Sequence, residues 1–99
     1  MASVDRVLEI LCDAERRRVL HMIDGHKDLT QTDVADQCDS QTRIELVHIH
    51  LPKLDEAGCI EWDRDGEEIS KGPHYEEVKA CLDLLESHAD ELPVVFTDL

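Results

Sequence analysis

The chain has 99 residues, of which 24 are Asp or Glu and 10 are Lys or Arg, so its formal net charge at pH 7 is −14. This length suits one domain and excludes a multidomain enzyme. The apolar fraction of 41% excludes a chain that stays disordered through low hydrophobicity. We therefore expect a folded acidic domain whose thin core, with only three aromatic residues, is supplemented by a second copy.

The composition also bears on location and cofactors. No stretch approaches the roughly 20 apolar residues of a membrane span, and the N-terminus lacks the pattern of a signal peptide. A cytoplasmic protein with no membrane partner is expected. Cys12, Cys38, Cys59 and Cys81 include no Cys-x-x-Cys pair. Reduced thiols are therefore expected, with no metal site and no cofactor.

The acidic residues are spread along the whole chain, and only four lysines accompany them. Such a surface repels nucleic acid in dilute buffer. In molar salt the Debye length falls to about 3 Å and the repulsion is screened. The composition is therefore typical of a halophilic protein, with an ordinary acidic interaction protein as the alternative.

Two helices are expected at the N-terminus. Ser3 can cap the first, in which apolar residues recur at helical spacing at Val4, Val7, Leu8 and Leu11. Asp13 can cap the second, which runs from about residue 14 to 24 and ends at Gly25.

The second helix begins with the only basic run of the chain, Arg16, Arg17 and Arg18. Cations fit poorly at the positive end of a helix dipole. The run therefore predicts acidic partners, which are either phosphate groups or carboxylates of the same chain.

A short helix, a polar turn and a longer helix follow. Thr30-Gln31-Thr32-Asp33 has the form of a capping box and predicts a third helix from about Gln31 to Gln37. After a polar turn at residues 39–42, a fourth helix is predicted by a buried stripe of Ile44, Val47, Leu51 and Leu54. Leu46 and Ile49 lie off this stripe, in a wider core face or a partner-facing patch. Pro52 removes a backbone donor, so we expect one helix with a kink near His48.

The pattern beyond Gly58 predicts a hairpin and a last helix. Ile60 and Trp62 share one face of a strand, Asp65-Gly66 is typical of a hairpin turn, and residues 68–70 return. Gly72-Pro73 then starts a helix with an apolar stripe of Val78, Cys81, Leu82, Leu85 and Leu92. The expected fold is mainly α with a small β-hairpin, in the order α-α-α-α-β-β-α. Residues 1–92 form one domain, whose last helix serves dimerisation, and residues 93–99 form a tail.

A short helix, a polar turn, a longer helix and a hairpin in this order are typical of a winged helix-turn-helix, whose second helix enters the DNA major groove. Three segments carry a resemblance: residues 14–20, 33–35 and 48–63, with His50-Leu51-x-x-Leu54-x-x-Ala57-Gly58 as the sharpest part. Over about residues 5–71 the chain resembles ArsR-like winged helix-turn-helix regulators, in particular small haloarchaeal domains of unassigned function. Metal-sensing members carry paired cysteines in the short helix, where this chain offers only Cys38.

The predicted DNA-binding residues lie on the outer side of the fourth helix and at the hairpin tip: Gln41, Thr42, Arg43, His48 and Arg64. Gln and Arg match the edges of adenine and guanine. His50 is expected to be half-buried and to donate to backbone. The predicted dimer interface joins the first and last helices through Val4, Val7, Leu8, Leu11, Val78, Leu82 and Leu85. A dimer holds two reading helices one DNA turn apart.

These features favour a transcription regulator that binds double-stranded DNA as a winged-helix homodimer. The alternative is an interaction module of the same fold that docks a basic partner or mimics DNA, because Arg64 stands among acids at the hairpin tip. A third hypothesis is a thiol sensor, in which oxidation of Cys12 or Cys81 alters pairing. No glycine-rich phosphate loop, activated nucleophile or metal-binding spacing is recognised, so no enzyme is predicted.

Overall fold

The computed structural model describes residues 3–25, 28–36 and 38–91. The elements in chain order are α1 (Val4–Leu11), α2 (Ala14–Gly25), β1 (Leu29–Thr30), α3 (Gln31–Ala35), α4 (Ser40–Glu45), η1 (Leu46–His50), α5 (Leu51–Glu56), β2 (Ile60–Asp63), β3 (Glu68–Lys71), α6 (Tyr75–Ser87) and η2 (Ala89–Glu91). The prediction of a mainly helical chain with a small hairpin is confirmed. The predicted tail at residues 93–99, together with Leu92 and Gln37, lies outside the described residues.

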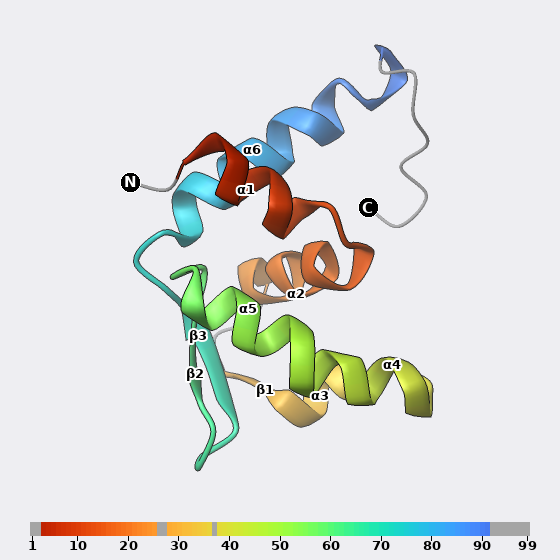
Figure 1. Ribbon diagram of the computed structural model, residues 1–99, viewed down its shortest axis with the longest axis vertical. Coiled ribbons are helices and arrows are strands. Elements are labelled where there is room, and N and C mark those ends of the chain that lie inside the picture. The colour runs from red at the N-terminus through yellow and green to blue at the C-terminus, as the bar shows by residue number, and fades with distance from the viewer. Residues whose placement is uncertain (1–2, 26–27, 37, 92–99) are drawn as a thin grey trace.

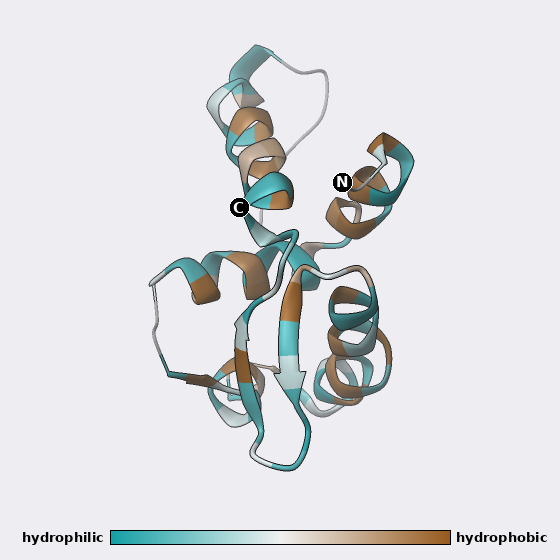
Figure 2. Ribbon diagram, turned by 90° about the vertical axis from the view of Figure 1, so that its left-hand side faces the viewer, coloured by the Kyte–Doolittle hydropathy of each residue, from teal (hydrophilic) through white to brown (hydrophobic). Residues whose placement is uncertain are grey.

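The elements are arranged around α2, which contacts α1, α6, β3 and η1. α1 and α6 lie together at one end of the molecule, and the tip of the β2–β3 hairpin lies at the opposite end (Figure 1). The side view in Figure 2 shows the same division, with α1 and α6 standing above the sheet. Within the described residues, no helix is long and apolar enough to cross a membrane.

The sheet has three antiparallel strands in the order β1-β3-β2, one more than the sequence predicted. β1 places Leu29 opposite Ile69, which in turn lies opposite Trp62 of β2. Two residues are too few for a period of two to be read from sequence. β1 leads directly into α3, and the Gln31 N–H donates to the Glu67 carbonyl at 2.8 Å. β1 therefore connects the start of α3 to the hairpin.

The core between these elements is formed by apolar side chains from every helix except α4 and η2, and from all three strands. Its members include Ile10, Leu20, Val34, Leu46, Leu54, Ile60, Ile69, Val78 and Leu82. The buried Tyr75 hydroxyl donates to the Leu20 carbonyl at 3.0 Å and so joins α6 to α2. Burial raises the pKa of Tyr75 above its ordinary value.

α6 begins at Tyr75 rather than at Gly72-Pro73, which is where the sequence placed its start. The reason is a competing set of backbone hydrogen bonds. The Gly72 N–H donates to the Cys59 carbonyl at 3.1 Å, and the His74 N–H donates to the Gly58 carbonyl at 2.8 Å. Because these groups are bonded to the turn between α5 and β2, the helix starts only after them.

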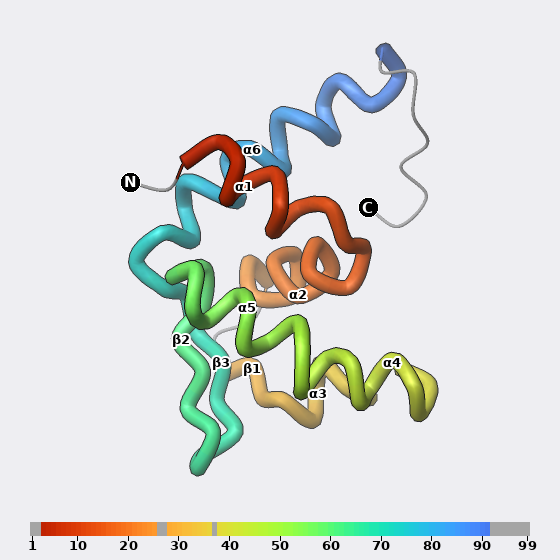
Figure 3. Tube along the Cα trace, in the orientation of Figure 1, coloured from red at the N-terminus to blue at the C-terminus, as the bar shows by residue number. Residues whose placement is uncertain are grey.

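The predicted fourth helix is one continuous rod made of α4, η1 and α5 (Figure 3). The distortion near His48 is a π-helical turn, in which the Leu51 N–H donates to the Leu46 carbonyl five residues earlier. Pro52 has no N–H for the His48 carbonyl, and its ring would crowd that carbonyl in an α-helix. A wider turn just before the proline removes this conflict.

The π-turn changes which side chains face the core. Leu46 is completely buried, whereas Ile44 is 56% exposed and Val47 is half-buried. The predicted stripe is therefore wrong at Ile44, and Leu46 belongs to the core. One extra residue in a turn rotates the preceding part of the helix by roughly one residue step. Leu51 and Leu54, which follow the turn, are buried as predicted.

Gly58 ends the rod with a left-handed backbone, at φ +79°. The Cys59 N–H donates to the Leu54 carbonyl at 2.9 Å, and the Gly58 N–H donates to the Asp55 carbonyl at 3.1 Å. These two bonds form a Schellman motif, which releases the chain from the helix. A Cβ at this position would lie 2.6 Å from the His74 ring, so the position requires glycine.

Cys59 is 1% exposed, and burial raises its pKa to about 11 from the ordinary value of 9.0. Because the folded state holds this proton more tightly, its contribution to stability is complete below pH 9 and is lost as the pH rises toward 11. We expect Cys59→Ala to lessen the alkaline loss in the free energy of unfolding by about 2–3 kcal/mol. Urea unfolding of both chains between pH 8 and about pH 11 measures this. Parallel pH profiles for the two chains would contradict it.

Candidate nucleic-acid interface

α3 and the rod are held by two side-chain caps at their N-termini. The predicted capping box is present: the Asp33 N–H donates to the Thr30 hydroxyl at 3.1 Å, and the Thr30 N–H donates to the Asp33 carboxylate at 3.0 Å. At the start of α4, the Thr42 N–H donates to the Asp39 carboxylate at 2.8 Å. Hydrogen bonds from Thr42 lower the pKa of Asp39. Both caps are local and explain why α3 and the rod are separate helices.

The predicted reading residues lie toward the N-terminal half of the rod. Gln41, Arg43 and His48 are exposed, whereas Thr42 is half-buried. Gln41 Nε2 donates to Glu45 Oε1 at 3.1 Å, and Arg43 Nη2 donates to the Ala35 carbonyl at 3.3 Å. Arg43 therefore bridges the rod to the end of α3 and lines a shallow hollow between the two helices.

Two large apolar side chains of the rod are exposed, which the sequence did not predict for Ile44. Ile44 is 56% exposed and Ile49 is 50% exposed. Ile49 and His48 line a second hollow, which is shared with Arg6 and Lys53. Lys53 Nζ lies 2.8 Å from Glu9 Oε1. This ion pair lowers the pKa of Glu9 and joins α5 to α1.

The hairpin tip is a four-residue loop, because Asp63 pairs with Glu68. The predicted hairpin turn at Asp65-Gly66 is present, but within a loop that is longer than a two-residue turn. The Asp63 carboxylate accepts from the Asp65 N–H at 3.1 Å and from the Gly66 N–H at 3.2 Å, and the positive φ of 58° falls on Glu67. An Asx-type turn therefore sets the loop in place of a two-residue glycine turn.

Arg64 does not extend from this tip as a free cation. Its guanidinium lies 4.5 Å from the centre of the Trp62 ring, in a cation–π arrangement. The elements of the rod and hairpin, residues 39–71, carry nine carboxylates against four Lys or Arg side chains. This face is therefore acidic overall, and any contact with phosphate depends on Arg43, Arg64 and bound cations.

The basic run has a structural role that the sequence did not reveal, because its arginines bind helix carbonyls. Arg16 donates to the Ile10 carbonyl at 2.8 Å and to the Glu9 carbonyl at 2.9 Å. Arg17 donates to the Leu11 carbonyl at 2.7 Å. These carbonyls lie in the last turn of α1, where carbonyls have no partner within the helix backbone.

Arg18 completes the pattern at the C-terminus of α3. It donates to the Val34 carbonyl at 3.0 Å and forms an ion pair with Glu15 at 2.9 Å. The basic run therefore binds mainly backbone carbonyls, and Glu15 is its carboxylate partner. Because all three guanidinium groups are engaged within the subunit, the expectation of a phosphate partner for this run is replaced by helix capping.

His50 is 5% exposed and lies on the π-turn. Arg16 Nη1 approaches His50 Nδ1 at 3.1 Å, and because arginine can only donate, Nδ1 accepts this bond. His50 Nε2 faces Asp13 Oδ1 at 3.6 Å. The expected bond from His50 to backbone is therefore replaced by a chain that runs from the end of α1 through Arg16 to the rod.

The seven residues predicted for the dimer interface fall into two groups. Val7, Leu11, Val78 and Leu82 are buried in the core of their own subunit. Val4 and Leu8 are exposed and Leu85 is half-buried. These three line an apolar groove between α1 and α6, together with Val7, Glu77, Cys81 and Leu84.

The four cysteines are free thiols, as expected. Cys12 and Cys81 are exposed, and the Cys12 thiol donates to the Glu9 carbonyl at 3.0 Å. Cys38 lies between α2 and α3, where burial raises its pKa. Across the described part of the chain, no group of three or more His, Cys, Asp and Glu side chains could hold a metal ion.

Comparison with known proteins gives one family. A family described as a domain of unknown function, DUF7344, matches residues 8–70, which is more than half of the chain and runs from α1 to β3. No curated protein matches the chain.

Proposed function

We propose that this chain, which belongs to the DUF7344 family, is a winged helix-turn-helix protein that binds double-stranded DNA and regulates transcription in a halophilic archaeon. The observation that carries the proposal is the arrangement of α3, the rod and the β2–β3 hairpin. Leu46, Leu51 and Leu54 are buried on the inner side of the rod. Its exposed side chains include Gln41, Arg43, Ile44, His48 and Ile49. A rod of this kind, placed after a short capped helix, fits a major groove.

In this proposal the parts of the motif have distinct tasks. Gln41, Arg43 and His48 meet base edges, because their side chains are exposed on the rod. Arg64 and the hairpin approach the phosphate backbone as a wing. In this proposal the protein acts in the cytoplasm and works by binding DNA rather than by catalysis. Its relation to ArsR-like regulators is likewise proposed.

Two copies pair through the face formed by α1 and α6. This face lies at the opposite end of the molecule from the hairpin tip, so pairing leaves the rod and the wing free (Figure 1). Isologous pairing through one apolar patch is the commonest way to form a homodimer. The dimer then presents two rods to DNA, and the doubled number of contacts compensates for the small number of cations on each rod.

The test is a titration of the intact protein with duplex DNA of random sequence at molar KCl, followed by selection of the bound sequences. At that salt the carboxylates no longer repel phosphate, so we expect binding there and none in dilute buffer. Arg43→Ala should weaken binding by about 10- to 100-fold, the range of a lost base contact. Arg64→Ala should cause a smaller loss. Fluorescence anisotropy of labelled DNA measures each affinity.

Lys71→Ala is the matched control for this titration. It removes one positive charge at the base of β3, where Lys71 Nζ lies 3.6 Å from Glu76 Oε1 and over the Tyr75 ring. Its affinity should remain close to that of the unchanged protein. Equal losses for Lys71→Ala and Arg43→Ala would mean that net charge, and not the rod, determines binding. Absence of binding at every salt concentration would overturn the DNA-binding function.

A second candidate is favoured by Ile44 and Ile49, which are half-exposed on a rod surrounded by carboxylates. An apolar centre with an acidic rim fits a basic protein partner, or imitates DNA toward one. This function predicts that the chain displaces duplex DNA from a basic DNA-binding protein and that Ile44→Asp abolishes the displacement. A chain that itself binds DNA at molar KCl, and displaces nothing, would exclude this candidate.

A further inference from the structure

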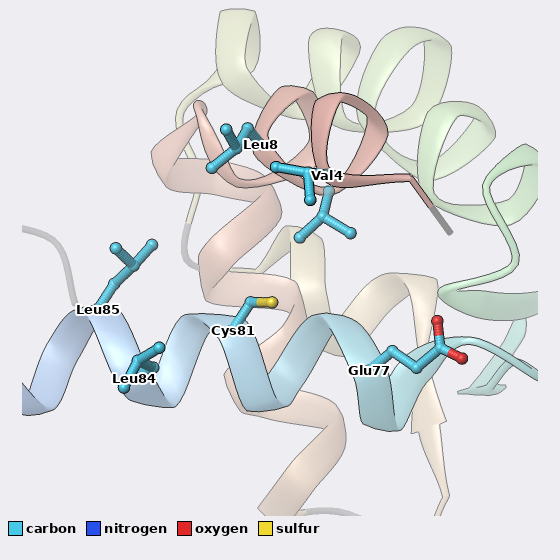
Figure 4. A pocket seen from close by; sticks show the side chains of 7 residues that line it. Val4, Leu8, Glu77, Cys81, Leu84 and Leu85 are labelled. Atoms are coloured by element: carbon cyan, nitrogen blue, oxygen red, sulfur yellow. The ribbon is translucent and has the colours of Figure 1, made fainter. Parts of the chain in front are cut away.

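An apolar groove lies between α1 and α6. It has a volume of about 440 Å³ and is lined by Val4, Val7, Leu8, Glu77, Cys81, Leu84 and Leu85. Figure 4 shows Val4 and Leu8 on α1, with Cys81 and Leu85 of α6 pointing toward α1 and Leu84 on the near side of α6. Val4 is 72% exposed and Leu84 is 60% exposed. An apolar surface of this kind marks a place that another segment covers.

The chain contains one segment with matching chemistry. Residues 92–96 read Leu-Pro-Val-Val-Phe and carry no charge, in a sequence that has a formal net charge of −14. They lie outside the described residues and follow η2, which ends at Glu91. Burying the side chains of Val94, Val95 and Phe96 would remove from water the most concentrated apolar stretch near the C-terminus.

We infer that residues 92–96 of one copy occupy the α1–α6 groove of a second copy, so that two copies exchange their C-terminal segments. This inference rests on the pairing of two copies proposed above and not on DNA binding. It names the occupant of the proposed interface. In an isologous pair both grooves are filled by the same segment, which closes the assembly at two copies.

The lengths favour exchange over return to the same subunit. The groove extends along α6 from Glu77 to Leu85, a distance of roughly 12 Å at 1.5 Å per residue. To enter its own groove, the chain would have to reverse after Glu91, and a turn takes about four residues. Too little would then remain of the apolar stretch to pass Leu85 and reach Val4. A segment from a second copy needs no reversal, and its five apolar residues span about 16 Å when extended.

The local sequence supports an extended course. Pro93 disfavours helical backbone at the residue before it, so the sequence favours an extended segment after Glu91. An extended segment presents alternate side chains to opposite sides. Val94 and Phe96 would then share one side, where they can meet the apolar groove side chains of α1 and α6.

The first test compares the dimer dissociation constants of the intact chain and a chain that ends at Glu91, by sedimentation or light scattering at molar KCl. We expect the shortened chain to dimerise at least on the order of 100-fold more weakly. Phe96→Asp should also weaken dimerisation. Thr97→Asp is its matched control, because it adds the same charge one residue beyond the apolar stretch and should leave dimerisation unchanged.

The groove is tested by Leu84→Glu, which should also prevent pairing. Because Leu84 is exposed in the single subunit, this change should leave thermal unfolding of the monomer nearly unaltered. Ile44→Glu is the matched control, since Ile44 is exposed to a similar degree but lies on the rod. Loss of pairing in Leu84→Glu and not in Ile44→Glu is the expected result.

Cross-linking distinguishes exchange from return to the same subunit. We would introduce Val94→Cys, on the side of the segment that faces the groove, in a chain with Cys12→Ser and Cys38→Ala, leaving Cys81 in the groove and Cys59 buried. Mild oxidation of a mixture of ¹⁴N- and ¹⁵N-labelled protein should give a covalent dimer. Its disulfide-linked peptides should join Cys81 of one isotope to the introduced thiol of the other. Linked peptides of a single isotope only, in a monomer, would show return to the same groove and overturn the exchange.

The possible failures can be told apart. A chain that is monomeric at every concentration would overturn the proposed pairing and the exchange with it. A dimer that is equally stable without residues 92–99 would overturn the exchange alone. Neither result depends on whether the protein binds DNA, because every measurement is made without DNA.

Discussion

Replacing Arg16 by methionine is expected to lower the free energy of unfolding by about 3–5 kcal/mol, a large share of the roughly 5–15 kcal/mol of a typical domain. Arg16 is 5% exposed, and its guanidinium is bonded to the Ile10 and Glu9 carbonyls and to His50. Removing it leaves the Ile10 carbonyl and His50 Nδ1 buried without this donor, and each lost partner carries a desolvation cost. Urea unfolding at molar KCl, followed by circular dichroism, measures the change.

Arg17→Met is the matched control, because it removes the same group from the adjacent position. Arg17 is half-buried, and its guanidinium donates a hydrogen bond to the Leu11 carbonyl at the C-terminus of α1. We expect it to cost about 1 kcal/mol, the value of one hydrogen bond. Equal losses for the two variants would show that the buried connection from α1 to the rod contributes nothing beyond one capped carbonyl.

The elements that could be predicted from sequence are those whose signals are local. Ser3 accepts a hydrogen bond from the Arg6 N–H, and the Thr30 capping box forms as the spacing of Thr and Asp indicates. A cap depends on residues three positions apart, so no tertiary structure is needed to recognise it. The same holds for β2, where Ile60 and Trp62 alternate with polar residues, and for β3, which follows a hairpin turn signal.

The hydrogen-bond partners of the basic run could not be predicted from local signals of this kind. Within α2 alone, Arg16 is unfavourable, because a cation near the helix N-terminus is repelled by the positive end of the helix dipole. The preceding helix supplies the missing partner, because α1 has no basic residue in its last turn and its carbonyls end beside the start of α2. An arginine directly after a helix without a basic C-terminus is the signal that could have indicated this cap.

The candidate site was only partly predictable for a related reason. Exposure of Gln41, Arg43 and His48 follows from the periodicity of the rod, which sequence displays. The bond from Arg43 to Ala35 and the stacking of Arg64 on Trp62 join different elements, or depend on the shape of the hairpin loop. Val78 and Leu82 were assigned to an interface because an apolar stripe cannot show whether its partner is the same subunit or another.

The second large effect expected is at Leu46, where alanine should lower the free energy of unfolding by about 2–5 kcal/mol. Ile44→Ala, two residues earlier, should change it by no more than about 0.5 kcal/mol. Leu46 is completely buried, and Ile44 is 56% exposed. The comparison removes apolar side chains of equal size from the same rod, so only their burial differs. Urea unfolding of both variants measures the difference.

A straight α-helix predicts the opposite order, because Ile44 would then continue the stripe of Leu51 and Leu54, and Leu46 would lie at its edge. A larger loss for Ile44→Ala than for Leu46→Ala would therefore contradict the π-turn. The turn also decides what the outer side of the rod offers to a partner. Because the wider turn before Pro52 rotates the first half of the rod, Ile44 faces outward with His48, and both candidate functions depend on that surface.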